Sequence, residues 1–95
     1  MSGYCVYIMA SGRNGTLYAG MTNDLAQRVR KHKKGTASEF TKQYDVKRLV
    51  YYEKYKSMEE ALVREKQMKS WKRQWKMRLV DHCNPEWKDL WEDLV

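Results

Sequence analysis

The sequence predicts a mixed α/β fold of the α+β class, in a single domain that spans residues 1–95. Aromatic and β-branched residues are concentrated in three short segments, and apolar residues recur at helical spacing in three others. A chain of 95 residues suits one domain rather than two. With 42% apolar residues, 13% aromatic residues and no low-complexity run, the composition is that of a folded chain.

The first two strands are predicted at residues 4–9 and 16–21, since both segments are rich in aromatic and apolar residues. Between them, residues 11–15 read Ser-Gly-Arg-Asn-Gly, a composition that favours a tight turn. The sequence therefore predicts a β-hairpin at the start of the chain.

The register of this hairpin determines which side chains meet. Pairing Met9 with Thr16 would also pair Tyr7 with Tyr18. Opposed residues point to the same face of a sheet, with Cβ atoms about 4.5 to 5.5 Å apart. We therefore expect the two tyrosine hydroxyl groups to stand side by side.

A first helix is predicted after the hairpin, with Thr22 or Asn23 as its N-cap and its end at Lys34 and Gly35. Its inward stripe consists of Leu25, Val29 and His32. Residues 35–46 are predicted as a polar loop, and residues 48–53 as a third strand.

Ser57, followed three residues later by Glu60, is a capping-box pattern that predicts a second helix. The inward stripe of this helix is apolar with one exception, and consists of Met58, Ala61, Leu62, Glu65 and Met68. A third helix is predicted from residue 70 or 71 to about residue 80, burying Trp71, Trp75 and Leu79. The remaining tail passes through Asn84 and Pro85 and is expected to dock through Trp87, Leu90 and Trp91.

Composition excludes several classes of protein. The longest apolar runs fall far short of the roughly 20 residues that a membrane-spanning helix needs. The amino end shows no basic segment followed by a long apolar stretch, so we expect a cytoplasmic protein. Cys5 and Cys83 alone predict neither a disulfide framework nor a zinc site.

The charge is unevenly distributed. Residues 81–95 hold five acidic residues against Lys88 alone, a net charge of −4, and since the whole chain carries +7, residues 1–80 carry +11. One basic cluster occupies residues 28–34, and a second runs through residues 64–78 with tryptophans interleaved. Two interpretations are open: phosphate and base contacts with nucleic acid, or amphipathic helices with solvated basic faces. The candidate nucleic-acid-binding residues are Arg30, Lys31, Lys33, Lys34, Lys69, Lys72, Arg73 and Lys76.

Glu65 interrupts an apolar helical face, where a carboxylate is unfavourable unless it is paired or bound to a metal. One interpretation is a salt bridge at the helix margin with Arg64, Lys69 or another cation. The other is a Mg²⁺ ligand, because this ion is often held by one or two carboxylates and completes its shell with water and phosphate oxygens.

The paired tyrosines also allow two interpretations, as packed residues with satisfied hydroxyls or as groups that take part in proton transfer. Nearby cations would favour the phenolate, whereas ordered contacts would let a neutral phenol relay a proton. Arg28 is either a solvated helix residue or a planar donor for a phosphate oxygen on which charge builds. His32, one turn later, is either structural or a group that contacts water or phosphate.

Taken together, these residues resemble the GIY-YIG nuclease superfamily, and more closely its small stand-alone bacterial members, the UPF0213 group. The resemblance rests on Cys5-Val6-Tyr7, on Leu17-Tyr18-Ala19-Gly20 ten residues later, and on an ordered set of single residues. That set consists of Thr22, Arg28, His32, Glu65 and the late Asn84-Pro85. The resemblance covers nearly the whole chain.

The resemblance implies a three-stranded antiparallel sheet flanked by helices, and a divalent-metal-dependent endonuclease acting on DNA. By matching positions, Tyr7 would be the general base, Tyr18 would position water or phosphate, and Arg28 would stabilise the phosphate in the transition state. His32 would assist near the scissile bond, and Glu65 would bind Mg²⁺ or Mn²⁺. Site support would come from Gly20, Thr22 and Asn84.

Three hypotheses about function follow. The first is a Mg²⁺- or Mn²⁺-dependent DNA endonuclease guided by DNA structure rather than by a long sequence, since 95 residues leave no room for an added DNA-binding domain. A protein partner would then supply any targeting. The second is a nucleic-acid-binding module with the same fold and little or no turnover. The third is a protein-interaction adaptor that uses the acidic, tryptophan-rich tail from Asp81 to Val95.

Overall fold

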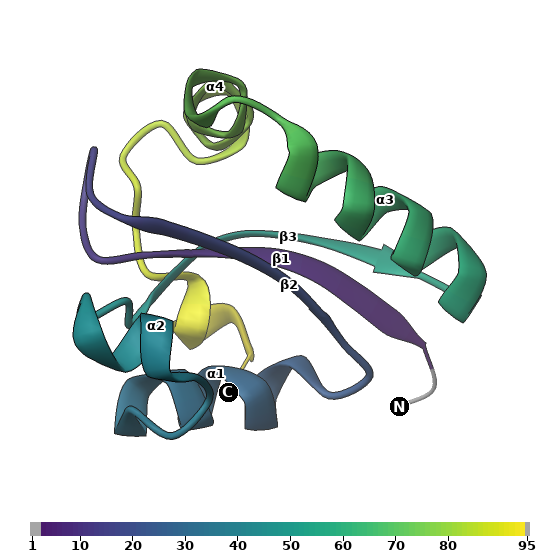
Figure 1. Ribbon diagram of the computed structural model, residues 1–95, viewed down its shortest axis with the longest axis horizontal. Helices are drawn as coiled ribbons and strands as arrows, with labels where there is room; N and C mark the ends of the chain where they lie inside the picture. The colour runs from purple at the N-terminus through teal and green to yellow at the C-terminus, as the bar shows by residue number, and fades with distance from the viewer. Residues whose placement is uncertain (1–2, 95) are drawn as a thin grey trace.

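The computed structural model describes residues 3–94, which form three strands, four α-helices and one short 3₁₀-helix (Figure 1). In chain order these are β1 (Tyr4–Ala10), β2 (Leu17–Thr22), α1 (Leu25–Lys34), α2 (Glu39–Gln43), β3 (Arg48–Tyr55), α3 (Met58–Ser70), α4 (Arg73–Cys83) and η1 (Leu90–Leu94). None of the helices in this part of the chain has the length and apolar character needed to span a membrane.

The strands form one antiparallel sheet in the order β2-β1-β3, so the first strand is central. Residues 6–10 of β1 are completely buried, because helices cover both faces of the sheet (Figure 1). One face packs against α3 and α4 through Val6, Ile8 and Ala61. The other packs against α1 and the C-terminal tail through Tyr7, Met9 and Val29. The predicted three-stranded antiparallel sheet with flanking helices is confirmed.

The register of the hairpin differs from the predicted one. Met9 pairs with Tyr18, and Tyr7 pairs with Gly20. The Ser11 N–H donates to the Thr16 carbonyl at 3.0 Å, just beyond the two strand ends, and this hydrogen bond closes a loop of four residues. The pairing of Met9 with Thr16 was therefore wrong by two residues. A shift of two preserves the face, so the two tyrosines remain on the same side of the sheet as diagonal neighbours.

Helix α1 begins one residue later than the predicted caps allow. Asp24, rather than Thr22 or Asn23, is the N-cap, and its Oδ1 accepts the Gln27 N–H at 3.1 Å. The predicted end is confirmed, because Gly35 adopts a left-handed conformation with φ 78° that glycine tolerates best. The inward stripe is also confirmed, with Leu25, Val29 and His32 all buried.

Residues 35–46 are not simply a polar loop, because they contain α2. Ser38 caps this short helix, and its Oγ accepts the Thr41 N–H at 3.1 Å. Thr41 and Val46 are fully buried, so the segment packs onto α1 and the sheet. Local propensity for a five-residue helix is weak, and burial of these two residues decides its formation.

The two later helices confirm part of their predicted stripes. Ser57 caps α3 as predicted, and Ala61 and Met68 are buried, whereas Met58 is 45% exposed. Helix α4 begins at Arg73 instead of at residue 70 or 71, and its buried residue is Val80. Trp75 is 52% exposed rather than buried, and its ring lies 5.6 Å from the Arg78 guanidinium.

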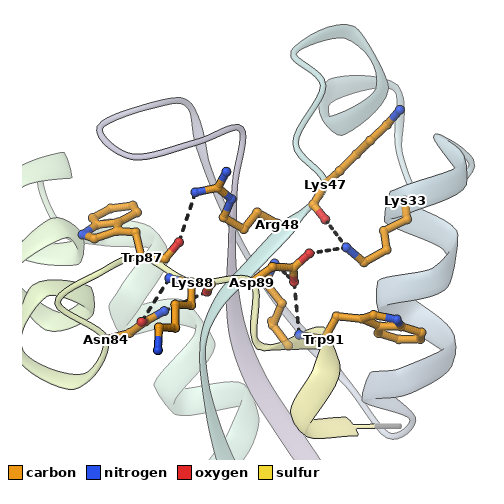
Figure 2. A network of polar contacts seen from close by, with 9 residues as sticks. Lys33, Lys47, Arg48, Asn84, Trp87, Lys88, Asp89 and Trp91 are labelled. Carbon is orange, nitrogen blue, oxygen red and sulfur yellow. Dashed lines mark hydrogen bonds and ion pairs between the residues drawn. The ribbon is translucent and has the colours of Figure 1, made fainter.

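The C-terminal tail docks on its own chain, as predicted. Trp87 is completely buried among residues of the sheet, and its Nε1 donates to Asp81 Oδ1 at 2.6 Å. Figure 2 shows Arg48 reaching the Trp87 carbonyl from β3, at 3.1 Å. Because α4 and η1 cover opposite faces of the sheet, residues 84–94 join the two layers around the edge strand β3 (Figure 1).

Two tail side chains bind the backbone of β3 (Figure 2). The pairing of β1 with β3 skips Val50, which forms a β-bulge. Asn84 Nδ2 donates to the Val50 carbonyl at 3.1 Å and so satisfies this irregular position. Asp89 accepts the Leu49 N–H at 3.2 Å and forms an ion pair with Lys33 of α1. The tail therefore also covers an exposed sheet edge.

Candidate active site

Tyr7, Tyr18 and His32 form an aromatic cluster between the sheet and α1. The ring centroids of the two tyrosines are 6.4 Å apart, and that of His32 lies 5.6 Å from Tyr7 and 5.3 Å from Tyr18. Tyr7 is completely buried and His32 is 1% exposed, whereas Tyr18 is half-buried. Strand alternation and the buried stripe of α1 therefore bring these predicted site residues together.

Gly20 makes room for Tyr7. A Cβ atom at this position would lie 2.7 Å from Tyr7 Oη and 2.8 Å from Cζ, closer than side chains tolerate. The phenol ring therefore occupies the space above Gly20, its partner in the sheet. This close approach, rather than a special backbone turn, is the reason for glycine at this position.

A chain of hydrogen bonds links Tyr7 to α2. Tyr7 Oη lies 3.0 Å from His32 Nε2, and His32 Nδ1 lies 3.3 Å from Thr41 Oγ1. The Thr41 hydroxyl donates to the Ser38 carbonyl at 3.2 Å, so it accepts from Nδ1–H. Nε2 of the neutral imidazole is then the acceptor for the Tyr7 hydroxyl. No pattern in the sequence marks Thr41 as a site residue, because its segment lacks a helical pattern.

Electrostatics keep both members of this pair neutral. Burial, followed by the positive charge of Arg28, lowers the pKa of His32 to about 4. Burial and then Tyr18 raise the pKa of Tyr7 to about 12, with Arg28 opposing and Glu65 adding to the rise. A neutral phenol that relays a proton therefore agrees better with these surroundings than a phenolate does.

Arg28 and Glu65 reach the same site from different elements. Arg28 belongs to α1 and Glu65 to α3, and the charges of both affect the Tyr7 hydroxyl. The Glu65 side chain is 18% exposed and lies 3.3 Å from Lys69 Nζ, so the salt-bridge interpretation is realised in the structure. Because the Lys69 side chain is half exposed, this ion pair is screened by solvent and weak.

The neighbouring residue fixes the rotation of α3. Arg64 donates from Nε to Glu53 Oε1 at 2.9 Å and from Nη2 to Oε2 at 2.8 Å, a two-point contact with β3. Tyr51 and Tyr55 donate their hydroxyls to the same carboxylate. Because Arg64 is held on the β3 side, Glu65 is directed toward another side of the helix.

The donor set suits a metal that protein ligands hold only partly. Among residues 3–94, no group of three or more His, Cys, Asp and Glu side chains is arranged to hold a metal ion. Mg²⁺ commonly takes one or two carboxylates and fills its other positions with water and substrate phosphate. Glu65 is a single carboxylate whose charge acts on the Tyr7 hydroxyl, which fits a site of this open kind.

The other two predicted supporting residues, Thr22 and Asn84, contact parts of the chain other than the tyrosines. Thr22 Oγ1 accepts the Asp24 N–H at 3.0 Å and braces the start of α1, the helix that carries Arg28 and His32. Asn84 Nδ2 also donates to the Lys88 carbonyl at 2.9 Å, and its contacts are with the tail and β3. Asn84 therefore helps to pack the tail against β3.

The predicted nucleic-acid-binding residues come from elements on opposite faces of the sheet (Figure 1). Several are already engaged: Lys33 with Asp89, Lys69 with Glu65, Arg30 over the Trp91 ring at 5.5 Å, and Arg73 with the Asn14 carbonyl at 2.8 Å. Lys76 is partly buried, which lowers the pKa of its ammonium group. Within the described chain, Lys31, Lys34 and Lys72 are exposed cations without an ion-pair partner.

Comparison with known proteins agrees with the fold. A family model described as the GIY-YIG catalytic domain matches residues 3–79. UPF0213 proteins of Staphylococcus aureus strains N315 and Mu50 are 40% identical over 80 residues, which cover 84% of this chain and 96% of theirs. The solution NMR structure of a UPF0213 protein from Bacillus halodurans superposes with a TM-score of 0.52 at 33% identity, covering 83% of both chains.

Proposed function

This chain belongs to the GIY-YIG catalytic domain family, which implies a nuclease, and we propose that it is a divalent-metal-dependent endonuclease that hydrolyses DNA phosphodiester bonds. The observation that carries the proposal is the 3.0 Å contact between Tyr7 Oη and a neutral His32 Nε2, with the charges of Arg28 and Glu65 acting on the Tyr7 hydroxyl. In the proposed reaction His32 would be the proton acceptor, Arg28 the phosphate-binding cation and Glu65 the metal ligand.

Water attack on phosphorus requires loss of a proton. Tyr7 Oη accepts that proton while its own hydroxyl proton passes to His32 Nε2, so no free phenolate forms. The new bond joins the water oxygen to phosphorus, the bond to the leaving oxygen breaks, and solvent protonates the leaving oxygen. Thr41 holds the imidazole in the tautomer that accepts on Nε2.

The other residues bind the phosphate. The Arg28 guanidinium donates to a non-bridging oxygen, where negative charge increases during attack. The Tyr18 hydroxyl positions the water or the phosphate. When bound at Glu65, Mg²⁺ or Mn²⁺ would withdraw charge from the phosphate and the leaving oxygen, an effect of several kcal/mol.

The decisive test is metal-dependent cleavage by Glu65→Ala. We expect cleavage to fall by about 10³-fold or more, while DNA affinity is largely kept because the exposed lysines remain. The substrates are duplex, single-stranded, flapped and four-way DNA, each with Mg²⁺ and with Mn²⁺. Glu60→Ala, which removes an exposed carboxylate from the same helix, is the matched control and should cleave normally.

A further variant separates the two interpretations of Glu65. If Glu65 serves only the salt bridge, Lys69→Ala should impair cleavage as much as Glu65→Ala does. If Glu65 binds the metal, Lys69→Ala should keep its cleavage. Binding by the unmodified protein without nicking of any substrate would favour the nucleic-acid-binding module instead.

A further inference from the structure

A row of aromatic rings leads from the candidate active site to the surface of α2. The Phe40 ring centroid lies 6.2 Å from that of Tyr18, and the Tyr44 centroid lies 4.9 Å from that of Phe40. Burial decreases along this row, from a fully buried Tyr7 to Phe40 at 44% exposure and Tyr44 at 47%. The row therefore ends in two adjacent aromatic rings that face solvent.

These two rings are held in place relative to the site. Thr41, the residue after Phe40, is completely buried, and its hydroxyl contacts His32 Nδ1 at 3.3 Å. The same buried threonine that fixes the histidine tautomer thus anchors the segment that presents the aromatic pair. Exposed aromatic pairs are unfavourable in water and frequently mark binding surfaces.

The surrounding charge is complementary to a nucleic-acid backbone. Lys31 and Lys34, at the end of α1, are exposed and form no ion pair within residues 3–94. Lys42 of α2 is also exposed, and its Cγ lies 3.6 Å from where a Cβ of Gly35 would be, at the end of α1. Glu39 is the one acidic residue of α2. Aromatic rings beside a basic track are the combination that binds single strands without strict sequence preference.

We propose that Phe40 and Tyr44 form a stacking platform for unpaired DNA bases next to the phosphate bound at Tyr7 and Arg28. The proposal rests on the proposed nuclease function and specifies its substrate as DNA that is single-stranded or locally unpaired at the cut. Bases inside a duplex have their faces covered by neighbouring pairs, so only an unpaired base can place its ring against Phe40.

Equilibrium binding without divalent metal tests the platform in the full chain. We expect Phe40→Ala and Tyr44→Ala each to weaken binding of a single-stranded oligonucleotide by about 5- to 150-fold, while binding of the duplex of the same sequence stays within about twofold. Trp75→Ala, which removes a similarly exposed ring from α4, should change neither affinity. Phe40→Trp should restore binding of the single strand. Equal losses on both substrates, or no loss on the single strand, would overturn the platform.

Changing the DNA gives the same test without altering the protein. An oligonucleotide lacking one base should bind the unmodified protein more weakly at the stacking position, and this difference should disappear in Phe40→Ala. If no abasic position weakens binding, the platform is wrong.

Since none of these measurements requires cleavage, the platform can stand if the nuclease proposal fails. Conversely, if the protein binds and cuts duplex and single-stranded DNA equally well, the platform proposal is contradicted and the nuclease proposal is kept.

Discussion

At the scale of single residues, the site depends on groups held in their neutral forms. A phenol whose pKa is raised to about 12 does not ionise near neutral pH, and an imidazole whose pKa is lowered to about 4 is neutral. Thr41 accepts from its Nδ1–H, which leaves Nε2 without a proton. In the proposed reaction the pair would pass a proton from Tyr7 to His32, and Arg28 would supply the positive charge for the phosphate.

His32 also makes stability depend on pH. Its pKa is about 4 in the fold against an ordinary 6.5, so between these values the unfolded chain binds more protons than the folded one. The contribution of neutral His32 to the free energy of unfolding is fully present above pH 6.5 and is lost as the pH falls toward 4. Between pH 7 and pH 4.5, we expect the free energy of unfolding of the unmodified protein to fall by about 2 to 3 kcal/mol more than that of His32→Gln.

Urea unfolding at a series of pH values measures this difference. His82→Gln is the control, since that side chain is exposed and meets water in both states. Its curve should follow that of the unmodified protein. Parallel curves for His32→Gln and the unmodified protein would show that the buried imidazole does not titrate as described.

At the scale of elements, the contact between Arg64 and Glu53 sets the rotation of α3. The guanidinium makes two hydrogen bonds to the carboxylate and lies 5.0 Å from the Trp71 ring. Arg64→Lys keeps the charge but loses the planar fork and the stacking. We expect the free energy of unfolding to fall by about 1 to 2 kcal/mol.

Chemical denaturation measures the effect, with Lys66→Ala on the exposed side of α3 as the reference. That substitution should stay within about 0.5 kcal/mol of the unmodified protein. An Arg64→Lys protein as stable as the reference would mean that β3 does not fix the orientation of α3 through this pair.

The elements that the sequence predicted are those with a strong local pattern. Aromatic and β-branched runs located the strands, and caps such as Ser57 located the helices. Helix α2 was not predicted, because its stability comes from burial of Thr41 and Val46, which local propensity does not encode. The hairpin register was predicted wrongly for a related reason, since the Ser11 to Thr16 hydrogen bond depends on the conformation of the four-residue loop.

The arrangement of the candidate site residues follows from local patterns in the sequence. Strand alternation places Tyr7 and Tyr18 on one face under either register, and helical spacing places Arg28 and His32 one turn apart. The sequence alone could not show which charged side chains already have an ion-pair partner. The partners of Lys33 and Lys69 lie on the tail and on α3, and only the folded chain shows that both cations are already engaged.

At the scale of the whole molecule, Trp87 connects the tail to the core. Its side chain is completely buried with Val6 and Ile8 of the central strand. We expect Trp87→Ala to destabilise the protein by about 3 to 5 kcal/mol, a large part of the stability of a domain of this size. Trp75→Ala, at a 52% exposed position, should change stability by less than about 1 kcal/mol.

Urea denaturation followed by circular dichroism compares the two tryptophan variants directly. The structure requires a large difference between them, because one ring fills the core and the other faces solvent. If Trp87→Ala were as stable as Trp75→Ala, the tail would not be part of the folding unit.

The late position of Trp87 in the chain affects how the protein is made. A ribosome releases the polypeptide from its amino end, so the central strand emerges long before the indole ring that completes its packing. Val6 and Ile8 can pack against α3 and α4 earlier, but they lack their contact with Trp87 until residue 87 has been translated and has left the exit tunnel. Synthesis rate and nascent-chain chaperones would then act on this protein during the interval between those two events.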